Sequence, residues 1–239
     1  MPPGVPAATI AAMTKLTITL HGASGAQGAP LARRLLAAGH RVRAAVRRPE
    51  LAPSGCEPFP TDLSDPAALD RAYDGADAVV VQLPQVFDAT AVAQAERVAA
   101  ALGRSGVERA VLNAGGPTGA TGMPYLDART LLAEHATAVV EPCGPYMENL
   151  AAPWSAARVA AGVLAYPLPA AALVSWIALG DVADRIVAAL ERGERGRLAI
   201  RGPRALTGAE AASAIAGALG RPVRYRPVAP AEFGAMVRP

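Results

Sequence analysis

Three glycines, Gly22, Gly25 and Gly28, have the type and spacing that could support chemistry. They separate a strand-like segment (16–20) from a segment (26–40) in which leucines recur at helical spacing. The first turn of a helix has unpaired N–H groups and a partial positive charge, so it attracts phosphate. Gly22 would permit the tight turn, Gly25 the approach of a pyrophosphate, and Gly28 the packing of helix on strand. The pattern predicts a dinucleotide-binding turn; a glycine-rich turn kept for packing is the alternative.

The end of the next predicted strand (41–46) indicates which dinucleotide. An acidic residue at this place binds the ribose 2′-hydroxyl of NAD, whereas an arginine accommodates the 2′-phosphate of NADP. Here the strand is followed by Arg47 and Arg48, and the first acidic residue is Glu50. We therefore predict that NADP(H) is preferred, with NAD(H) possible. A solvated arginine in an arginine-rich chain is the alternative for Arg47.

The rest of the chain alternates between strand-like and helix-like segments. This alternation predicts an α/β fold with a doubly wound parallel Rossmann sheet and a small α+β C-terminal domain folded against it. We expect the Rossmann domain over 14–150 and small cap elements over 151–239, some of whose strands rejoin the main sheet. Residues 1–13 are interpreted as a flexible extension. One helix is expected to begin at Pro66 with Ser64 or Asp65 as its cap, and another to be opened by Thr207. In the second half, 144–162 looks helical and 221–228 is the last expected strand.

Composition and charge limit the classes of function. The net charge is +3, Lys15 is the only lysine, and the arginines are scattered, so no nucleic-acid-binding stripe is expected. Cys56 and Cys143 lack metal-ligand spacing and are expected as free thiols. The uncharged stretch 159–180 contains "YPLP", which favours a buried loop and strand over a membrane span. A cytoplasmic monomer or homodimer with a small-molecule substrate is expected.

Several segments together resemble the NmrA-like family of atypical short-chain dehydrogenases/reductases. They are "HGASGAQGAPLARRLLAAGHRVRAAVRRP", "TDLSDPAAL", "ADAVVVQLP", "EPCGPYMENL" and "WIALGDVADRIVAAL". The resemblance runs from about residue 16 to 230. It implies an NAD(P)-binding Rossmann domain and a smaller domain that closes a substrate cleft. Members include NADPH-dependent quinone reductases as well as redox sensors with no known chemistry.

The resemblance also assigns cofactor-binding positions, which apart from Arg129 lie at the carboxyl ends of predicted strands. It implies that the pyrophosphate lies on the glycine turn, the 2′-phosphate at Arg47, the adenine near the third strand, the ribose along the fourth and the nicotinamide between the fifth and sixth. The implied residues are Gly22, Ser24, Gly25, Ala26, Gln27, Gly28, Arg47, Asp62, Leu63, Gln82, Leu83, Pro84, Asn113, Ala114, Arg129, Pro142, Gly144 and Tyr146.

The catalytic pattern of short-chain dehydrogenases is only partly present. Those enzymes pair a tyrosine with a lysine four residues on, whereas "YLDAR" places Tyr125 and Arg129 at that spacing. Arginine can bind a ribose or stabilise a phenolate, but it does not supply a proton. Asn113 stands where a serine would polarise the substrate carbonyl. Either lysine has been replaced without functional cost, or the full proton relay is not needed.

Other titratable residues receive structural interpretations. His21 is expected as a packed strand end, His40 in a turn and His135 at the surface or capping a helix. The Cys143 thiol could matter in the nicotinamide wall, although a small buried residue is the plainer interpretation. The chain ends at "AEFGAMVRP", where family members generally continue, so either an incomplete substrate lid or an unusually open cleft is expected. The expected function is an NADPH-dependent reductase of quinones or small carbonyl compounds. A non-catalytic NADP(H) sensor with a protein partner is the alternative.

Overall fold

A seven-stranded parallel sheet is the centre of the computed structural model, which describes residues 15–119 and 121–237. The strand order β3-β2-β1-β4-β5-β6-β9 reverses direction between β1 and β4, which is the switch point at which open α/β sheets bind ligands. The doubly wound Rossmann sheet predicted from the sequence is thus confirmed. The strands are β1 (Thr17–His21), β2 (Arg41–Val46), β3 (Glu57–Pro60), β4 (Ala78–Val81), β5 (Arg109–Asn113), β6 (Ala138–Pro142) and β9 (Gly196–Ile200).

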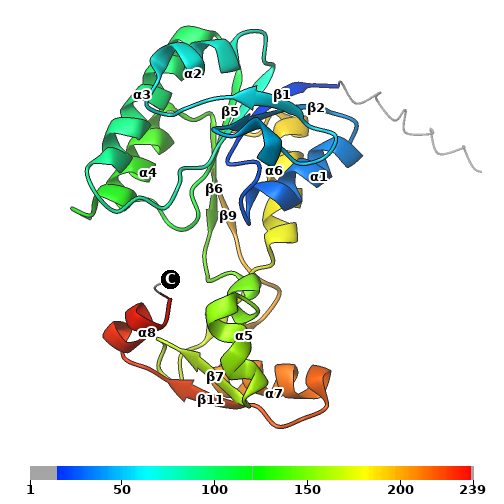
Figure 1. Ribbon diagram of the computed structural model, residues 1–239, viewed down its shortest axis with the longest axis vertical. Helices are drawn as coiled ribbons and strands as arrows, with labels where there is room; N and C mark the ends of the chain where they lie inside the picture. Colours follow the sequence, from blue (N-terminus) through cyan, green and yellow to red (C-terminus); the bar gives the residue numbers. More distant parts are fainter. Residues whose placement is uncertain (1–14, 120, 238–239) are drawn as a thin grey trace, which may run out of the picture.

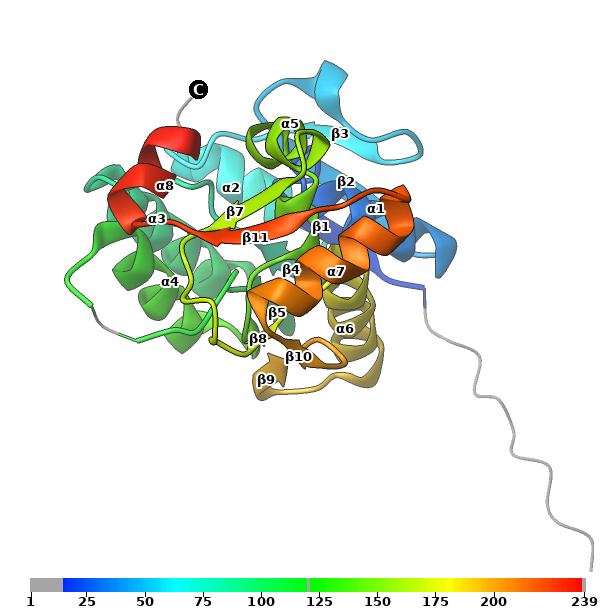
Figure 2. The same ribbon diagram turned by 90° about the horizontal axis from the view of Figure 1, so that it is seen from below.

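Helices cover both faces of this sheet, as Figures 1 and 2 show. One face packs on α1 (Gly28–Ala37) and α6 (Leu179–Arg192), and the other on α2 (Pro66–Tyr73), α3 (Thr90–Ser105) and α4 (Pro124–His135). Both cores consist mainly of alanine, valine and leucine, as the low aromatic content requires. Since β9 pairs with β6 and α6 packs on α1, residues 179–200 belong to the layers of the main sheet.

Two predicted helix starts have the expected capping chemistry. The Asp65 side chain accepts a hydrogen bond from the Ala67 N–H, and Pro66 opens α2. Thr207 caps α7 (Gly208–Leu219) in a reciprocal capping box with Glu210. Helix α1 begins at Gly28 rather than near Ala26, because 26–27 still belong to the glycine turn.

The remaining elements form a smaller lobe below the sheet in Figure 1. Trp154, Tyr166, Trp176 and Phe233 pack their rings together at its centre. The lobe contains η2 (Met147–Leu150), α5 (Pro153–Ala160), β7 (Val163–Tyr166), β8 (Val174–Ser175), β10 (Ala205–Leu206), α7, β11 (Arg224–Pro227) and α8 (Pro230–Val237).

The structure adds detail to two expectations for this half. Segment 144–162 is helical in two pieces, because Pro153 starts α5 anew after the short 3-10 helix η2. The last strand is β11, within the expected range 221–228, and the chain forms α8 after it; Phe233 holds this short helix against the aromatic rings.

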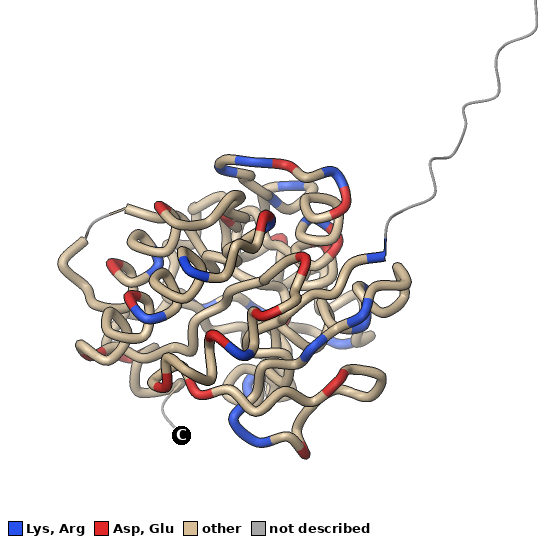
Figure 3. The backbone as a smooth tube through the Cα atoms, turned by 90° about the horizontal axis from the view of Figure 1, so that it is seen from above, with Lys and Arg blue, Asp and Glu red and all other residues tan. Residues whose placement is uncertain are grey.

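The uncharged segment 159–180 holds β7, β8 and the start of α6. Over 15–119 and 121–237, no helix has the length and apolar character that crossing a membrane requires. Basic and acidic residues are interspersed along the backbone in Figure 3. The predicted extension 1–13 lies outside the described residues.

Candidate functional site

The glycine turn between β1 and α1 is built around one carbonyl group. Gly22 has a φ of 63°, in the left-handed region that favours glycine. Its carbonyl oxygen accepts the N–H of Gly25 at 2.9 Å. A Cβ atom on Gly28 would lie 2.0 Å from that oxygen, which is far inside contact distance. The spacing of the three glycines therefore follows from the turn itself, and the Gly25 N–H is already used within it.

Four side chains connect the carboxyl ends of adjacent strands. Gln82, after β4, donates from Nε2 to the carbonyl oxygen of His21 at 3.1 Å. Asn113, at the end of β5, donates from Nδ2 to Gln82 Oε1 at 3.0 Å and to Gln27 Oε1 at 2.9 Å. The Tyr146 hydroxyl donates to the same Gln27 oxygen at 3.1 Å. The network ties the glycine turn to the ends of β4 and β5 and to the loop that follows β6.

Arg129 is buried beneath the loop that follows β5. It donates from Nη1 to the carbonyl oxygen of Ala114, and its guanidinium carbon lies 4.6 Å from the centre of the Tyr125 ring. Within the described chain its buried Nε has no hydrogen-bond partner. The cation thus contacts the face of the tyrosine ring and fixes the β5 end. A lysine could not combine this planar stacking with a directed N–H bond.

Two tyrosine hydroxyls converge on Gly115, which has a φ of 66°. A Cβ at this glycine would be 3.8 Å from the Tyr146 hydroxyl, 4.0 Å from that of Tyr125 and 3.5 Å from Arg129 Nη1. Burial raises the pKa of Tyr146 above its ordinary value, Tyr125 adds to the rise, and Arg129 opposes it. Tyr146 is therefore a neutral hydrogen-bond donor at neutral pH. The chain thus holds a second phenol here besides the predicted Tyr125, and sequence reasoning assigned it to cofactor binding alone.

The residues predicted for the adenine end lie together at the ends of two paired strands. Arg47 is exposed directly after β2, which pairs with β3. Asp62 follows β3 and accepts hydrogen bonds from the N–H and hydroxyl of Ser64. These bonds lower the pKa of Asp62, with a smaller contribution from Arg47. Leu63 packs partly buried against the core cluster under α2 and α3.

The other predicted positions fall in neighbouring loops. Ser24 and Ala26 are exposed in the glycine turn, and Leu83 and Pro84 follow Gln82. Pro142 is buried at the end of β6, and Gly144 lies against the smaller lobe, where a Cβ would be 1.9 Å from the Ser175 carbonyl oxygen. The Cys143 thiol is partly buried and donates to the Glu141 carbonyl oxygen at 3.4 Å.

Two histidines have structural roles. His21 is buried, and its Nε2 lies 2.8 Å from the buried Tyr73 hydroxyl. His40 is buried too, and its Nδ1 accepts the N–H of Leu16 at 3.2 Å; the interpretation of it as a turn residue missed this bond. His135 is exposed at the end of α4, as expected.

Burial lowers the pKa of His21 from 6.5 to about 4, which predicts a pH-dependent stability. The unfolded chain binds a proton below its pKa of 6.5 whereas the native chain resists it, so stability is lost as the pH falls from 6.5 toward 4. We expect wild type to lose about 3 kcal/mol more unfolding free energy than His21→Gln between about pH 7 and pH 4. Urea titrations of both proteins at each pH measure this difference. Parallel pH profiles would contradict it.

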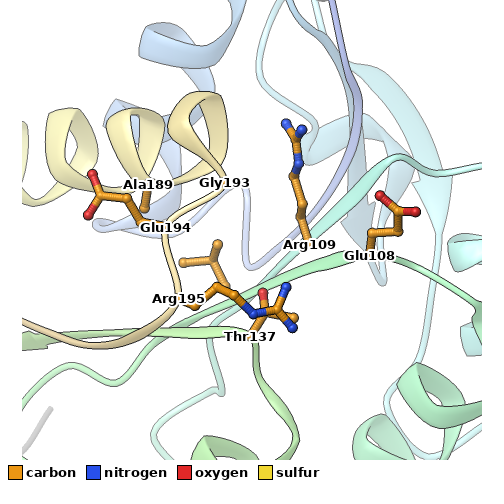
Figure 4. A pocket seen from close by; sticks show the side chains of 8 residues that line it. Glu108, Arg109, Thr137, Ala189, Gly193, Glu194 and Arg195 are labelled. Atoms are coloured by element: carbon orange, nitrogen blue, oxygen red, sulfur yellow. The ribbon is translucent and has the colours of Figure 1, made fainter.

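One hollow lies away from this network, and another adjoins it. The first, of about 220 Å³, is lined by Glu108, Arg109, Thr137 and Arg195 at the start of β5 and β6 and the end of α6 (Figure 4). This is the amino-terminal edge of the sheet, opposite to the edge at which such folds bind ligands. The second is a groove of about 740 Å³ beside Ala26, Arg33 and Glu148, adjoining the glycine turn.

Comparison with known proteins identifies the family. The model of the NmrA-like family matches residues 14–237. The chain belongs to the NmrA-like family. The predicted resemblance is thus confirmed.

Individual relatives of this NmrA-like protein are reductases. An NAD(P)H azoreductase of Xenophilus azovorans is 34% identical over 195 residues, 77% of this chain and 66% of that protein, so the chain spans just under two thirds of its length. A (4-alkanoyl-5-oxo-2,5-dihydrofuran-3-yl)methyl phosphate reductase of Streptomyces griseus is 34% identical over 225 residues, 87% of this chain and 76% of that protein. Among solved structures, a Citrobacter triphenylmethane reductase in complex with NADP(H) has a TM-score of 0.76 at 20% identity, covering 94% of this chain and 85% of that one.

Proposed function

We propose that this protein is an NADP(H)-dependent reductase of quinones or small carbonyl compounds. The observation that carries the proposal is the side-chain network from the glycine turn to the Gly115 loop, at the carboxyl ends of β1, β4, β5 and β6. A dinucleotide needs such a continuous edge, with a phosphate cradle at the switch point. Reductases that use NAD(P)H among the relatives support the same assignment.

The glycine turn fits a pyrophosphate. Gly25 is exposed and presents no side chain, and the positive end of the α1 dipole lies at the same place. Gly22, Ser24, Ala26, Gln27 and Gly28 complete this cradle. Arg47 would pair with a 2′-phosphate, with Asp62 and Leu63 beside the adenine. Gln82, Leu83 and Pro84 would line the ribose.

The Gly115 loop fits the reacting end. Asn113, Ala114, Pro142, Gly144 and Tyr146 would flank the nicotinamide, which when bound supplies a hydride to the acceptor. Arg129 would hold the β5 end and keep a positive charge near the developing negative charge. The Tyr125 hydroxyl would donate a hydrogen bond to the acceptor oxygen. The Tyr146 hydroxyl, which donates to Gln27 Oε1, and Asn113 would orient the network around it. Arg129 takes no part as a proton donor, because guanidinium does not deprotonate.

A direct test is oxidation of NADPH by purified protein across a panel of quinones and aldehydes. We expect turnover with at least one class of acceptor. NADPH binding without turnover on the whole panel would overturn the reductase.

A non-catalytic NADP(H) sensor is the second candidate. It is favoured by Arg129, whose cation contacts the ring of Tyr125 in place of the usual lysine arrangement. A sensor requires unequal affinities for NADP⁺ and NADPH, since a ligand shifts a conformation only by differential binding. Equal affinities together with rapid turnover would count against it.

Arg47→Ala tests the cofactor preference. Loss of a charge-assisted hydrogen bond should weaken NADPH binding by about 1–3 kcal/mol and leave NADH nearly unchanged. Fluorescence titration with each dinucleotide measures both affinities. The neighbouring Arg48→Ala is the matched control, because Arg48 is exposed as well. Equal losses for NADPH and NADH in the Arg47 variant would make Arg47 a structural residue.

A further inference from the structure

The exposed ring of Phe87 lies next to the candidate reacting end and takes no part in the network described above. Phe87 belongs to the loop between β4 and α3, and 67% of it is exposed to solvent. Its ring centre is 5.4 Å from that of Tyr125, at a tilt of 59°. The loop residue before it, Val86, packs against the hydrophobic core instead.

The loop holds Phe87 between two local hydrogen bonds. The N–H of Val86 donates to the Pro84 carbonyl oxygen at 2.9 Å, and Asp88 Oδ1 accepts the N–H of Thr90 at 2.8 Å. The second bond belongs to the start of α3. Phe87 is thus presented outward by backbone that is fixed on both sides.

A chain of contacts leads from this ring to the hydroxyls at Gly115. Phe87 contacts the Tyr125 ring, Arg129 contacts the same ring at 4.6 Å, and the Tyr125 hydroxyl lies near Gly115 with that of Tyr146. Phe87 is therefore one ring contact away from the side chain whose hydroxyl lies at Gly115. Aromatic rings stack on exposed phenylalanine through offset or edge contacts.

We propose that Phe87 and Tyr125 form a stacking subsite for the distal ring of a fused, planar aromatic acceptor. The inference rests on the proposed reductase function. It assigns to Phe87 the selection of two-ring over one-ring acceptors. The subsite binds the ring that is not reduced, so it contributes to affinity rather than to chemistry.

Two fully substituted quinones make a matched pair of probes, because their blocked ring positions do not react with Cys56 or Cys143. They are 2,3-dimethyl-1,4-naphthoquinone, with two rings, and tetramethyl-1,4-benzoquinone, with one. We expect Phe87→Ala to raise the KM of the naphthoquinone about tenfold, the scale of one aromatic contact, and to change that of the benzoquinone less than about twofold. Phe87→Tyr keeps an aromatic ring at this position and should have the wild-type KM for the naphthoquinone. Leu219→Ala, an exposed apolar residue at the end of α7, is the control.

Calorimetric binding of the naphthoquinone to NADP⁺-loaded protein separates this inference from the reductase function. Binding that Phe87→Ala weakens about tenfold supports the subsite even without turnover. Turnover with unchanged naphthoquinone affinity and KM in Phe87→Ala would overturn the subsite and leave the reductase standing. Absence of naphthoquinone binding to wild type would overturn it as well. Unchanged thermal unfolding of the variant should accompany either result, since the ring is mostly exposed.

Discussion

Gly25→Val is expected to raise the dissociation constants of both NADPH and NADH by at least about a hundredfold, or about 3 kcal/mol. Gly25 is exposed in the glycine turn, so a branched side chain there would occupy the space proposed for the pyrophosphate. Both dinucleotides share this group, and both should therefore lose affinity equally. Arg47→Ala differs from this variant, because it should weaken the binding of NADPH and leave that of NADH nearly unchanged.

The fold should survive Gly25→Val. A Cβ at Gly25 lies 3.3 Å from the Gly22 oxygen, a distance that a shift of a few tenths of an ångström relieves. Fluorescence titration measures binding, and thermal unfolding checks the fold. Gly217→Val in α7 is the control, because a Cβ there meets no atom within 4 Å. Retained affinity in a folded Gly25→Val protein would show that this turn is not the phosphate site.

The helix starts and the glycine turn were predictable from the sequence, because the contacts that cause them lie within a few residues of each other. Asp65 with Pro66 and Thr207 with Glu210 are helix starts because each cap bonds an N–H two or three residues away. The glycine turn belongs to the same class, since Gly22, Gly25 and Gly28 meet each other within one turn. Strand and helix alternation then determined the sheet.

The features that sequence reasoning missed depend on contacts between distant segments. Gln27 and Tyr146 are 119 positions apart, and only the folded sheet brings the tyrosine hydroxyl to the glutamine oxygen. Phe87 and Tyr125 likewise meet only because β4 and β5 are neighbours. His40 accepts the N–H of Leu16, and these two residues are 24 positions apart in the sequence. No periodicity in the sequence encodes such pairs.

Departure from a family pattern was visible in the sequence, but its consequence was not. "YLDAR" showed an arginine at the lysine position and left two explanations open. The structure adds that Arg129 bonds the Ala114 carbonyl and stacks on Tyr125, so the substitution is built into the loop that follows β5. It also places the Tyr146 hydroxyl beside the Tyr125 hydroxyl at Gly115.

Gly28→Ala is expected to destabilise the fold itself, by about 3 kcal/mol. The added methyl carbon would lie 2.0 Å from the Gly22 carbonyl oxygen and 2.7 Å from Gln82 Nε2. The oxygen is backbone and is already bonded to the Gly25 N–H, so relief requires the turn to move away from α1. That movement would also break the Gln82 bond to the His21 carbonyl, and dinucleotide affinity should fall with the stability.

Chemical denaturation of Gly28→Ala and Gly103→Ala tests this claim in one experiment. Gly103 lies within α3, and a Cβ there meets no atom within 4 Å. Alanine has the higher helix propensity, so Gly103→Ala should stabilise the protein by about 0.5–1 kcal/mol. Opposite signs for the same chemical change would locate the effect in the contact between Gly22 and Gly28. Equal stability of Gly28→Ala and wild type would mean that the turn accommodates a methyl group at residue 28. Gly28 would then not be required for the packing of α1 against β1.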